Sequence, residues 1–202
     1  MIISNYTDLY KKMITELPGC PKPLILQELQ QSAADFCERT EAWKDNLNSF
    51  DLVADQTTYH LNAPYDATLQ RILTVRINTA EGVTNGTEGA LQDESLYRFD
   101  PAIESLVFTN APSTVAISNA LDIKAVLVPT VDAEGVAQWF LNRYRTGIVA
   151  GALASLAVQP DKIWSSQFVF TKYDLRWRQA INKARAEKNR EFKGATPGFY
   201  KE

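Results

Sequence analysis

The chain offers few side chains whose type and spacing could support catalysis. His60 is the single histidine, and it lies in the alternating run TTYHLN. To act as a base it would need a nucleophile and an orienting acid from distant segments. Two cysteines, Cys20 and Cys37, cannot form a four-cysteine zinc site. Neighbouring acids such as Asp93 and Glu94 fall in expected loops. These residues indicate a protein that is not an enzyme.

The motifs that bind phosphates or metals, or that present a serine nucleophile, are also missing from the sequence. It contains no GxxxxGKS, GxxxxGKT or GxGxxG loop, no GxSxG turn, and neither CxxC nor HExxH spacing. We therefore expect no catalytic, cofactor-binding or metal-binding residue. We interpret His60 as a strand or surface residue, Cys37 as a small buried hydrophobe on a helix, and Cys20 as packed in a turn.

Charge is divided unevenly along the chain, whose formal net charge is −3. Residues 1–161 hold 11 Lys/Arg against 20 Asp/Glu, whereas residues 162–202 hold 10 against 4. Six of these cations fall on one expected helix: Arg176, Arg178, Lys183, Arg185, Lys188 and Arg190. An acidic body followed by a basic segment is a sign asymmetry that asks for an explanation.

Three interpretations of this basic segment stay open. It is a solvated helix face, a docking surface for an acidic protein, or a set of contacts with the phosphates of a nucleic acid. The aromatic residues Phe199 and Tyr200 favour a protein partner, because rigid aromatic side chains anchor interfaces. A sequence pI of about 5.3 argues against a protein dedicated to DNA.

The elements that must position these residues follow from the spacing of apolar side chains. A 3.6-residue period predicts helices over four segments: residues 6–17, 24–43, 136–158 and 167–191. Between residues 50 and 131, short runs instead alternate apolar and polar side chains, and Gly, Pro and Asn separate the runs. That alternation predicts an antiparallel sheet or small sandwich.

The order of these elements predicts an α+β fold that is mainly α. We expect a bundle of long helices with an inserted antiparallel β region and an extended C-terminal tail. Four segments follow: N-terminal helices of the helical body (1–49), the β region (50–131), the C-terminal long helices (132–191) and the tail (192–202). The longest nearly apolar run, residues 147–158, has 12 residues, whereas a bilayer-spanning helix needs about 20, so we expect no membrane span.

Three groups of residues carry a resemblance through their order along the chain. PGCP at residues 18–21 precedes a helix with FCERT at 36–40 and Trp43, GALA at 151–154 leads to QPDKIWS at 159–165, and Tyr173, Trp177 and Ile181 stand in a helix with ARA at 184–186. Together they resemble the head-to-tail adaptor (connector) proteins of tailed bacteriophages, the class that includes the tubular tail protein A and gatekeeper type adaptors. The likeness spans almost the whole chain.

The resemblance implies a structural virion protein and no enzyme. Such adaptors join the portal protein as a homo-oligomeric ring of twelve subunits and form a platform for tail or nozzle proteins. Genomic DNA passes through the lumen without specific binding. The implied location is the virion neck, after synthesis in the host bacterial cytoplasm, with no membrane partner and no cofactor.

The resemblance also implies that the C-terminal segment reaches toward the portal. The candidate portal-interface residues are then Arg176, Arg178, Lys183, Arg185, Lys188, Arg190, Phe192, Phe199 and Tyr200. The alternative function is a nucleic-acid-binding module that uses the basic C-terminal helix, since clustered Lys and Arg side chains neutralise backbone phosphates.

Overall fold

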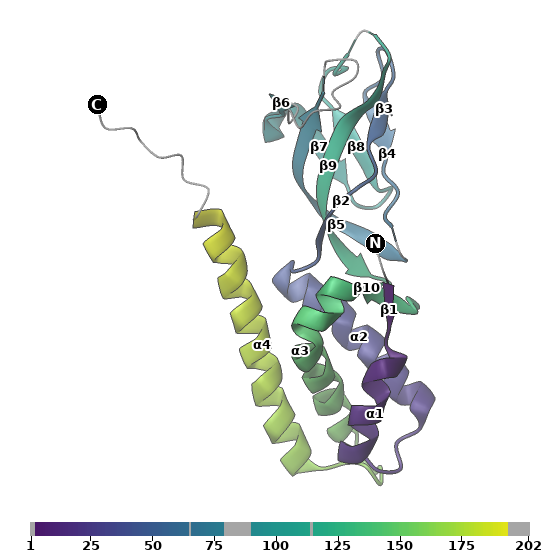
Figure 1. Cartoon of the computed structure of the whole chain (residues 1–202), viewed down its shortest axis with the longest axis vertical. Helices are drawn as coiled ribbons and strands as arrows, with labels where there is room; N and C mark the ends of the chain where they lie inside the picture. The colour runs from purple at the N-terminus through teal and green to yellow at the C-terminus, as the bar shows by residue number, and fades with distance from the viewer. Residues whose placement is uncertain (1–2, 65, 79–89, 114, 194–202) are drawn as a thin grey trace, which may run out of the picture. The chain divides into compact units, whose positions relative to one another are not determined.

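The computed structural model describes residues 3–64, 66–78, 90–113 and 115–193 (Figure 1). These residues form two compact units. The first, called the helical unit, comprises Met1–Ala42 and Pro129–Glu202, and the second, called the β unit, comprises Trp43–Val128. The chain therefore leaves the helical unit once, builds the β unit, and returns.

The described residues of the helical unit form four α-helices and a small two-stranded sheet. The helices are α1 (Thr7–Glu16), α2 (Lys22–Thr40), α3 (Gln138–Ala157) and α4 (Gln167–Lys193). Strand β1 (Ile3–Asn5) pairs antiparallel with β10 (Gly135–Ala137). Helix α4 packs against α3 and α2, and α1 packs against α2 and α3 (Figure 1).

Local sequence explains where the first two helices begin and end. The Asn5 side-chain oxygen accepts a hydrogen bond of 2.9 Å from the Thr7 backbone N–H, which satisfies a donor at the start of α1. Pro23 lies in the first turn of α2, where a missing N–H costs little. Helix α2 ends at Thr40, and the next residue, Glu41, has a left-handed φ of 51° that turns the chain away.

Small residues on α3 let the helices of the helical unit approach closely. A Cβ added to Gly147 would lie 2.8 Å from the Ala180 Cβ, and one added to Gly151 would lie 2.8 Å from the Trp177 ring. The Ser32 hydroxyl donates a buried hydrogen bond of 2.8 Å to the Ile148 carbonyl. The core around Gly147 and Gly151 therefore has room for glycine only, and a larger side chain at either position would have to displace its neighbours.

Where the structure describes the β unit, its strands form two antiparallel sheets. One has the strand order β2 (Lys44–Asn46), β9 (Ile117–Pro129), β5 (Ala67–Ile77) and β6 (Ala90–Leu91), with β3 (Phe50–Leu52) also paired to β9. The other has the order β4 (Thr58–His60), β8 (Ser105–Phe108) and β7 (Tyr97–Asp100), and a 3₁₀ turn over Glu94–Leu96 precedes β7. Phe108 packs edge-on against Tyr59, with ring centroids 5.8 Å apart.

The predicted fold class, a mainly α bundle of long helices with an inserted antiparallel β region and an extended tail, is wrong. Of the described residues, 44% are helical and 27% lie in strands of antiparallel sheets. The error has a physical cause. Several strands have only two to four residues, too few to display an alternation, and the last five residues of β9 are all buried, so period two is lost there.

The limits of the two units also differ from the segments expected at residues 50–131 and 192–202. The β unit begins at Trp43, because β2 pairs with β9 and so belongs to the large sheet. Helix α4 continues to Lys193, two residues beyond its expected end. The remainder of the expected tail, residues 194–202, lies outside the described residues.

Candidate functional site

The six cations expected to form one basic surface on the last helix lie on different sides of α4. Residues seven apart share one side of a helix, so Arg176, Lys183 and Arg190 form one flank. Arg178 and Arg185 are also seven apart and form the opposite flank. The sequence identified the basic helix, and the helical geometry distributes its cations over two opposite flanks.

The second flank of α4 is used within the helical unit. The Arg185 guanidinium donates a hydrogen bond of 2.9 Å to the backbone carbonyl of Arg39 in the last turn of α2. Lys188 forms an ion pair of 2.7 Å with Glu41, which caps the same helix end. Because the last carbonyls of a helix lack partners within it, these cations stabilise the end of α2.

Arg178 forms an ion pair of 2.9 Å with Asp174, one helical turn before it. Arg178, Arg185 and Lys188 thus have hydrogen-bond or ion-pair partners within the folded chain, and the Arg176 guanidinium lies 5.2 Å from the centroid of the Tyr173 ring. Phe192 belongs to α4, but its side chain lies outside what the structure describes, as do Phe199 and Tyr200.

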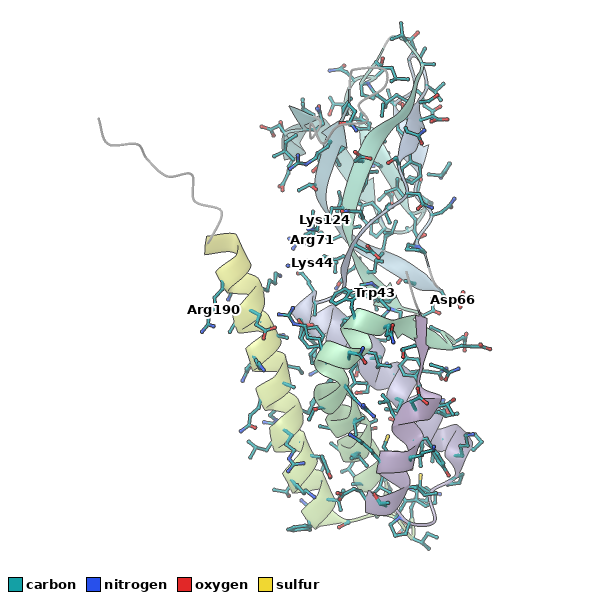
Figure 2. All side chains as sticks on the ribbon, viewed as in Figure 1. Trp43, Lys44, Asp66, Arg71, Lys124 and Arg190 are labelled. Atoms are coloured by element: carbon teal, nitrogen blue, oxygen red, sulfur yellow. The ribbon has the colours of Figure 1, made fainter. Side chains whose placement is uncertain are left out.

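The first flank of α4 borders a groove that we call the basic groove. It consists of two adjoining hollows of about 310 and 460 Å³ that share Thr146 and Arg176. Five cations from three helices line it: Lys12 of α1, Arg143 and Arg145 of α3, and Arg176 and Lys183 of α4. Arg190 follows Lys183 along the same flank and projects from the last turns of α4 (Figure 2).

The two carboxylates of the basic groove are both engaged by neighbouring side chains. Glu16 lies 3.3 Å from Lys172, and a hydrogen bond from the Tyr173 side chain, together with that lysine, lowers its pKa. Glu187 forms an ion pair of 3.0 Å with Arg143. The groove therefore keeps an excess of positive charge that would attract carboxylates or phosphates.

A second groove, which we call the acidic groove, lies on the other side of α4. It is a hollow of about 220 Å³ between α2, α3 and α4. Glu28, Asp35 and Asp174 line it, together with uncharged side chains such as Ser32 and Trp177. No cation of the described residues is among its lining, but Arg178 pairs with Asp174, so Glu28 and Asp35 carry the groove's net negative charge. The helical unit thus carries grooves of opposite charge.

The β unit has a smaller group of cations that the sequence did not reveal. Lys44 of β2, Lys124 of β9 and Arg71 of β5 belong to three neighbouring strands, and Figure 2 shows them projecting to the same side. Lys44 pairs with Val126 and Asn46 pairs with Lys124, so the two lysines share a face of the sheet. The pairing order of the strands brings these residues together, and no local motif marks them.

His60, the histidine considered for catalysis, joins two strands of the β unit through a hydrogen bond. The His60 side chain is exposed on β4, and its Nδ1 lies 2.7 Å from the Ser105 hydroxyl of β8. Ser105 is fully buried and also donates to the Ile103 carbonyl at 3.1 Å, so its oxygen is closed to a substrate in this conformation.

Both cysteines are buried, as their sequence contexts indicated. Burial raises the pKa of the Cys20 thiol and raises that of Cys37 well above its ordinary value. Since the thiolate is the nucleophilic form, neither side chain is activated.

Asp93, one of the neighbouring acids considered for catalysis, caps the 3₁₀ turn by accepting a hydrogen bond of 2.8 Å from the Ser95 backbone N–H.

The residues that the structure describes contain neither a cluster of metal ligands nor a membrane-spanning helix. No group of three or more His, Cys, Asp or Glu side chains is arranged to hold a metal ion there. Within the same residues, no helix combines the length and the apolar character needed to cross a bilayer.

Comparison with known proteins gives a likeness to a chain of a particle neck. No protein-family model and no curated protein matches the chain. Among solved structures, it is similar to a chain of the structure described as "Neck of empty GTA particle computed with C6 symmetry". The two share 14% sequence identity and a TM-score of 0.33, over 88% of this chain and 95% of that chain.

Proposed function

We propose that this chain is a structural protein of a phage-like particle that acts as a head-to-tail adaptor. Copies of it form a ring, of twelve subunits, below the portal and around the DNA channel, and the ring provides the platform to which tail or nozzle proteins attach. The protein works by assembly rather than by catalysis. It is made in the host bacterial cytoplasm and resides in the virion neck.

One observation carries this proposal. The first group of residues that resembles the adaptor proteins lies more than a hundred residues before the other two, yet all three meet in one core. The Phe36 ring of the first group lies 5.5 Å from the Trp177 ring of the third, and Gly151 of the second is in close contact with Trp177. A set of residues that packs together supports a shared fold better than the same residues scattered over a surface.

The charge distribution suits passage of DNA and attachment to a partner. Residues 1–161 are acidic in sum, which limits adhesion of DNA moving through a ring. Arg190, in the last turns of α4 beyond the lining of the basic groove, offers a cation to an acidic portal surface. Charges of this kind, exposed at the edge of a contact, steer association and select partners.

Disruption of the gene tests the proposed function. We expect particles with filled heads and no tails, because the attachment platform is missing. Supplying the wild-type protein during assembly should restore tails. Particles with normal tails in the absence of the protein would refute the proposal.

The alternative function, a nucleic-acid-binding module, is favoured by the basic groove. If it holds, the logarithm of DNA affinity falls linearly with the logarithm of salt concentration, with a slope of about −0.9 for each phosphate contacted. Arg176→Ala with Lys183→Ala should then flatten that slope, whereas Arg178→Ala on the opposite flank should not. If salt-dependent DNA affinity is absent from the wild-type protein, this alternative is excluded.

A further inference from the structure

The basic and acidic grooves lie on different sides of the same helical unit. Helix α4 separates them: Arg176 and Lys183 border the basic groove, and Asp174 borders the acidic groove. Positions 174 and 183 point to nearly opposite sides of a helix, since they are nine residues, or two and a half turns, apart. A single copy cannot close one of its grooves onto the other.

Two complementary surfaces on different sides of one unit are the requirement for head-to-tail association. Such heterologous contacts repeat from copy to copy and close into a ring when the rotation between neighbours allows it. We infer that the acidic groove of one copy, around Glu28 and Asp35, docks against the basic groove of the next, around Arg176 and Lys183. This inference rests on the proposed function and names the surfaces by which its ring is built.

A second copy of the chain fits these features better than a nucleic acid. Phosphates would engage the basic groove alone, and the carboxylates of Glu28 and Asp35 on the other side of α4 would have no part in that contact. A second copy uses both grooves at once. Each also has apolar or uncharged lining, including Trp177 and Ala180, so the contact does not consist of charges only.

Exposed apolar residues lie between the two grooves on the outward strip of α4. Phe168 and Leu175 are 78% and 58% exposed, and they are seven residues apart, so they share one side of the helix. A neighbouring helical unit that reached either groove would cover part of this strip. Burial of such large apolar side chains adds the non-directional attraction that charge pairs in water lack.

Charge reversal in the full-length protein tests the contact. Variant N carries Arg176→Glu and Lys183→Glu, so both of its grooves are acidic, and variant P carries Glu28→Lys and Asp35→Lys, so both are basic. We measure self-association by sedimentation equilibrium at about 0.05 M and about 0.5 M salt, across the range in which screening becomes strong. Wild-type association should be weaker at the higher salt concentration.

Mixing the variants makes the result specific. Each variant alone should associate about tenfold more weakly than the wild type, since like charges then face each other. In an equimolar mixture every groove of variant N meets an oppositely charged groove of variant P. The association constant should therefore return to within about threefold of the wild-type value.

Two control variants carry the same changes in charge outside the grooves. Lys11→Glu with Lys162→Glu matches variant N, and Asp132→Lys with Glu134→Lys matches variant P; all four residues are exposed in the helical unit. Both controls should associate like the wild type. Unchanged circular dichroism and melting temperature show that variants N and P are folded.

Any of three results would overturn the groove contact. These are a wild-type protein that stays monomeric at low salt up to about 1 mM, variants N and P that associate like the wild type, and a mixture of the two that stays dissociated. Tailless particles after gene disruption, combined with one of these results, would leave the adaptor role standing and reject only the contact. Normal tails after disruption would reject the adaptor role itself.

Discussion

Gly151 shows how a single residue sets the distance between helices in this protein. A methyl group at this position would lie 2.8 Å from the Trp177 ring and would also collide with the Ser32 hydroxyl, which is held by its hydrogen bond to Ile148. Gly151→Ala should therefore destabilise the protein by about 1–3 kcal/mol, as overpacking does. Urea denaturation measures the loss, and Ser155→Ala, at an exposed position of the same helix, is the matched control.

Gly151→Ala could also leave the stability unchanged or raise it, and that result would have a clear physical meaning. Alanine is favoured over glycine in a helix by about 0.5–1 kcal/mol. A variant as stable as the wild type, or more stable, would show that Trp177 can shift without cost. The close fit of α3 described above would then be incorrect.

Glu16 makes the stability of the helical unit depend on pH. Its pKa is lowered, first by the hydrogen bond from the Tyr173 side chain and then by Lys172. A carboxyl whose pKa is depressed by folding contributes stability above its ordinary pKa of 4.5 and loses that contribution as the pH falls through the lowered value. Glu16→Gln should thus be less stable than the wild type at pH 7.

The difference between wild type and Glu16→Gln should shrink steadily below pH 4.5, where the wild-type carboxyl begins to gain its proton. Thermal melts at a series of pH values measure this difference. A gap in melting temperature that stays constant into strong acid would contradict the assigned role of Glu16.

The burial of a residue was predictable from the sequence where it depends on a single helix or strand. Cys37 was expected to be buried because it lies on the apolar stripe of a helix, and it is fully buried. The hydrogen bond between His60 and Ser105 was not predictable, because it joins residues 45 apart whose contact depends on strand register. The same holds for the contact between Gly151 and Trp177, which depends on how two helices pack.

At the scale of elements, α4 fastens the C-terminal end of α2. Arg185→Ala removes a charge-assisted hydrogen bond to the Arg39 carbonyl and should cost about 1 kcal/mol. Amide hydrogen exchange should become faster in the last turn of α2, over residues 37–41. Arg178→Ala serves as the control, since Arg178 belongs to an exposed pair one helical turn apart, and such pairs contribute about 0.3–0.5 kcal/mol.

Equal effects of Arg185→Ala and Arg178→Ala on hydrogen exchange in α2 would mean that Arg185 does not cap the helix. If both variants instead lost protection from hydrogen exchange throughout α4, the cause would be a change in helical propensity. The prediction therefore depends on where in the chain the exchange rates change, as well as on the loss of stability.

The helices were more predictable than the strands, for a physical reason. A helix of nineteen or twenty residues, such as α2 or α3, repeats its apolar period several times, and prolines mark the start of α2. A strand such as β2 has three residues and exists because β9 offers it a partner. Its stability lies in the pairing, which the local sequence does not encode.

At the scale of the whole molecule, the sequence revealed that charge is unevenly divided but not how it is arranged. Ten cations and four acids in residues 162–202 indicated one basic arm. In the folded helical unit, part of that charge caps α2, and part faces a groove that also draws Lys12 from α1 and Arg143 from α3. Carboxylates of α2 and α4 form the opposing groove. Packing of helices distant in sequence created both surfaces.

Imaging the neck of purified particles at side-chain resolution tests the adaptor role most directly. We expect a ring of copies of this chain between portal and tail, with the acidic groove of each copy facing the basic groove of the next. Particles in which this fold is absent from the neck, or located elsewhere in the virion, would contradict the proposed function.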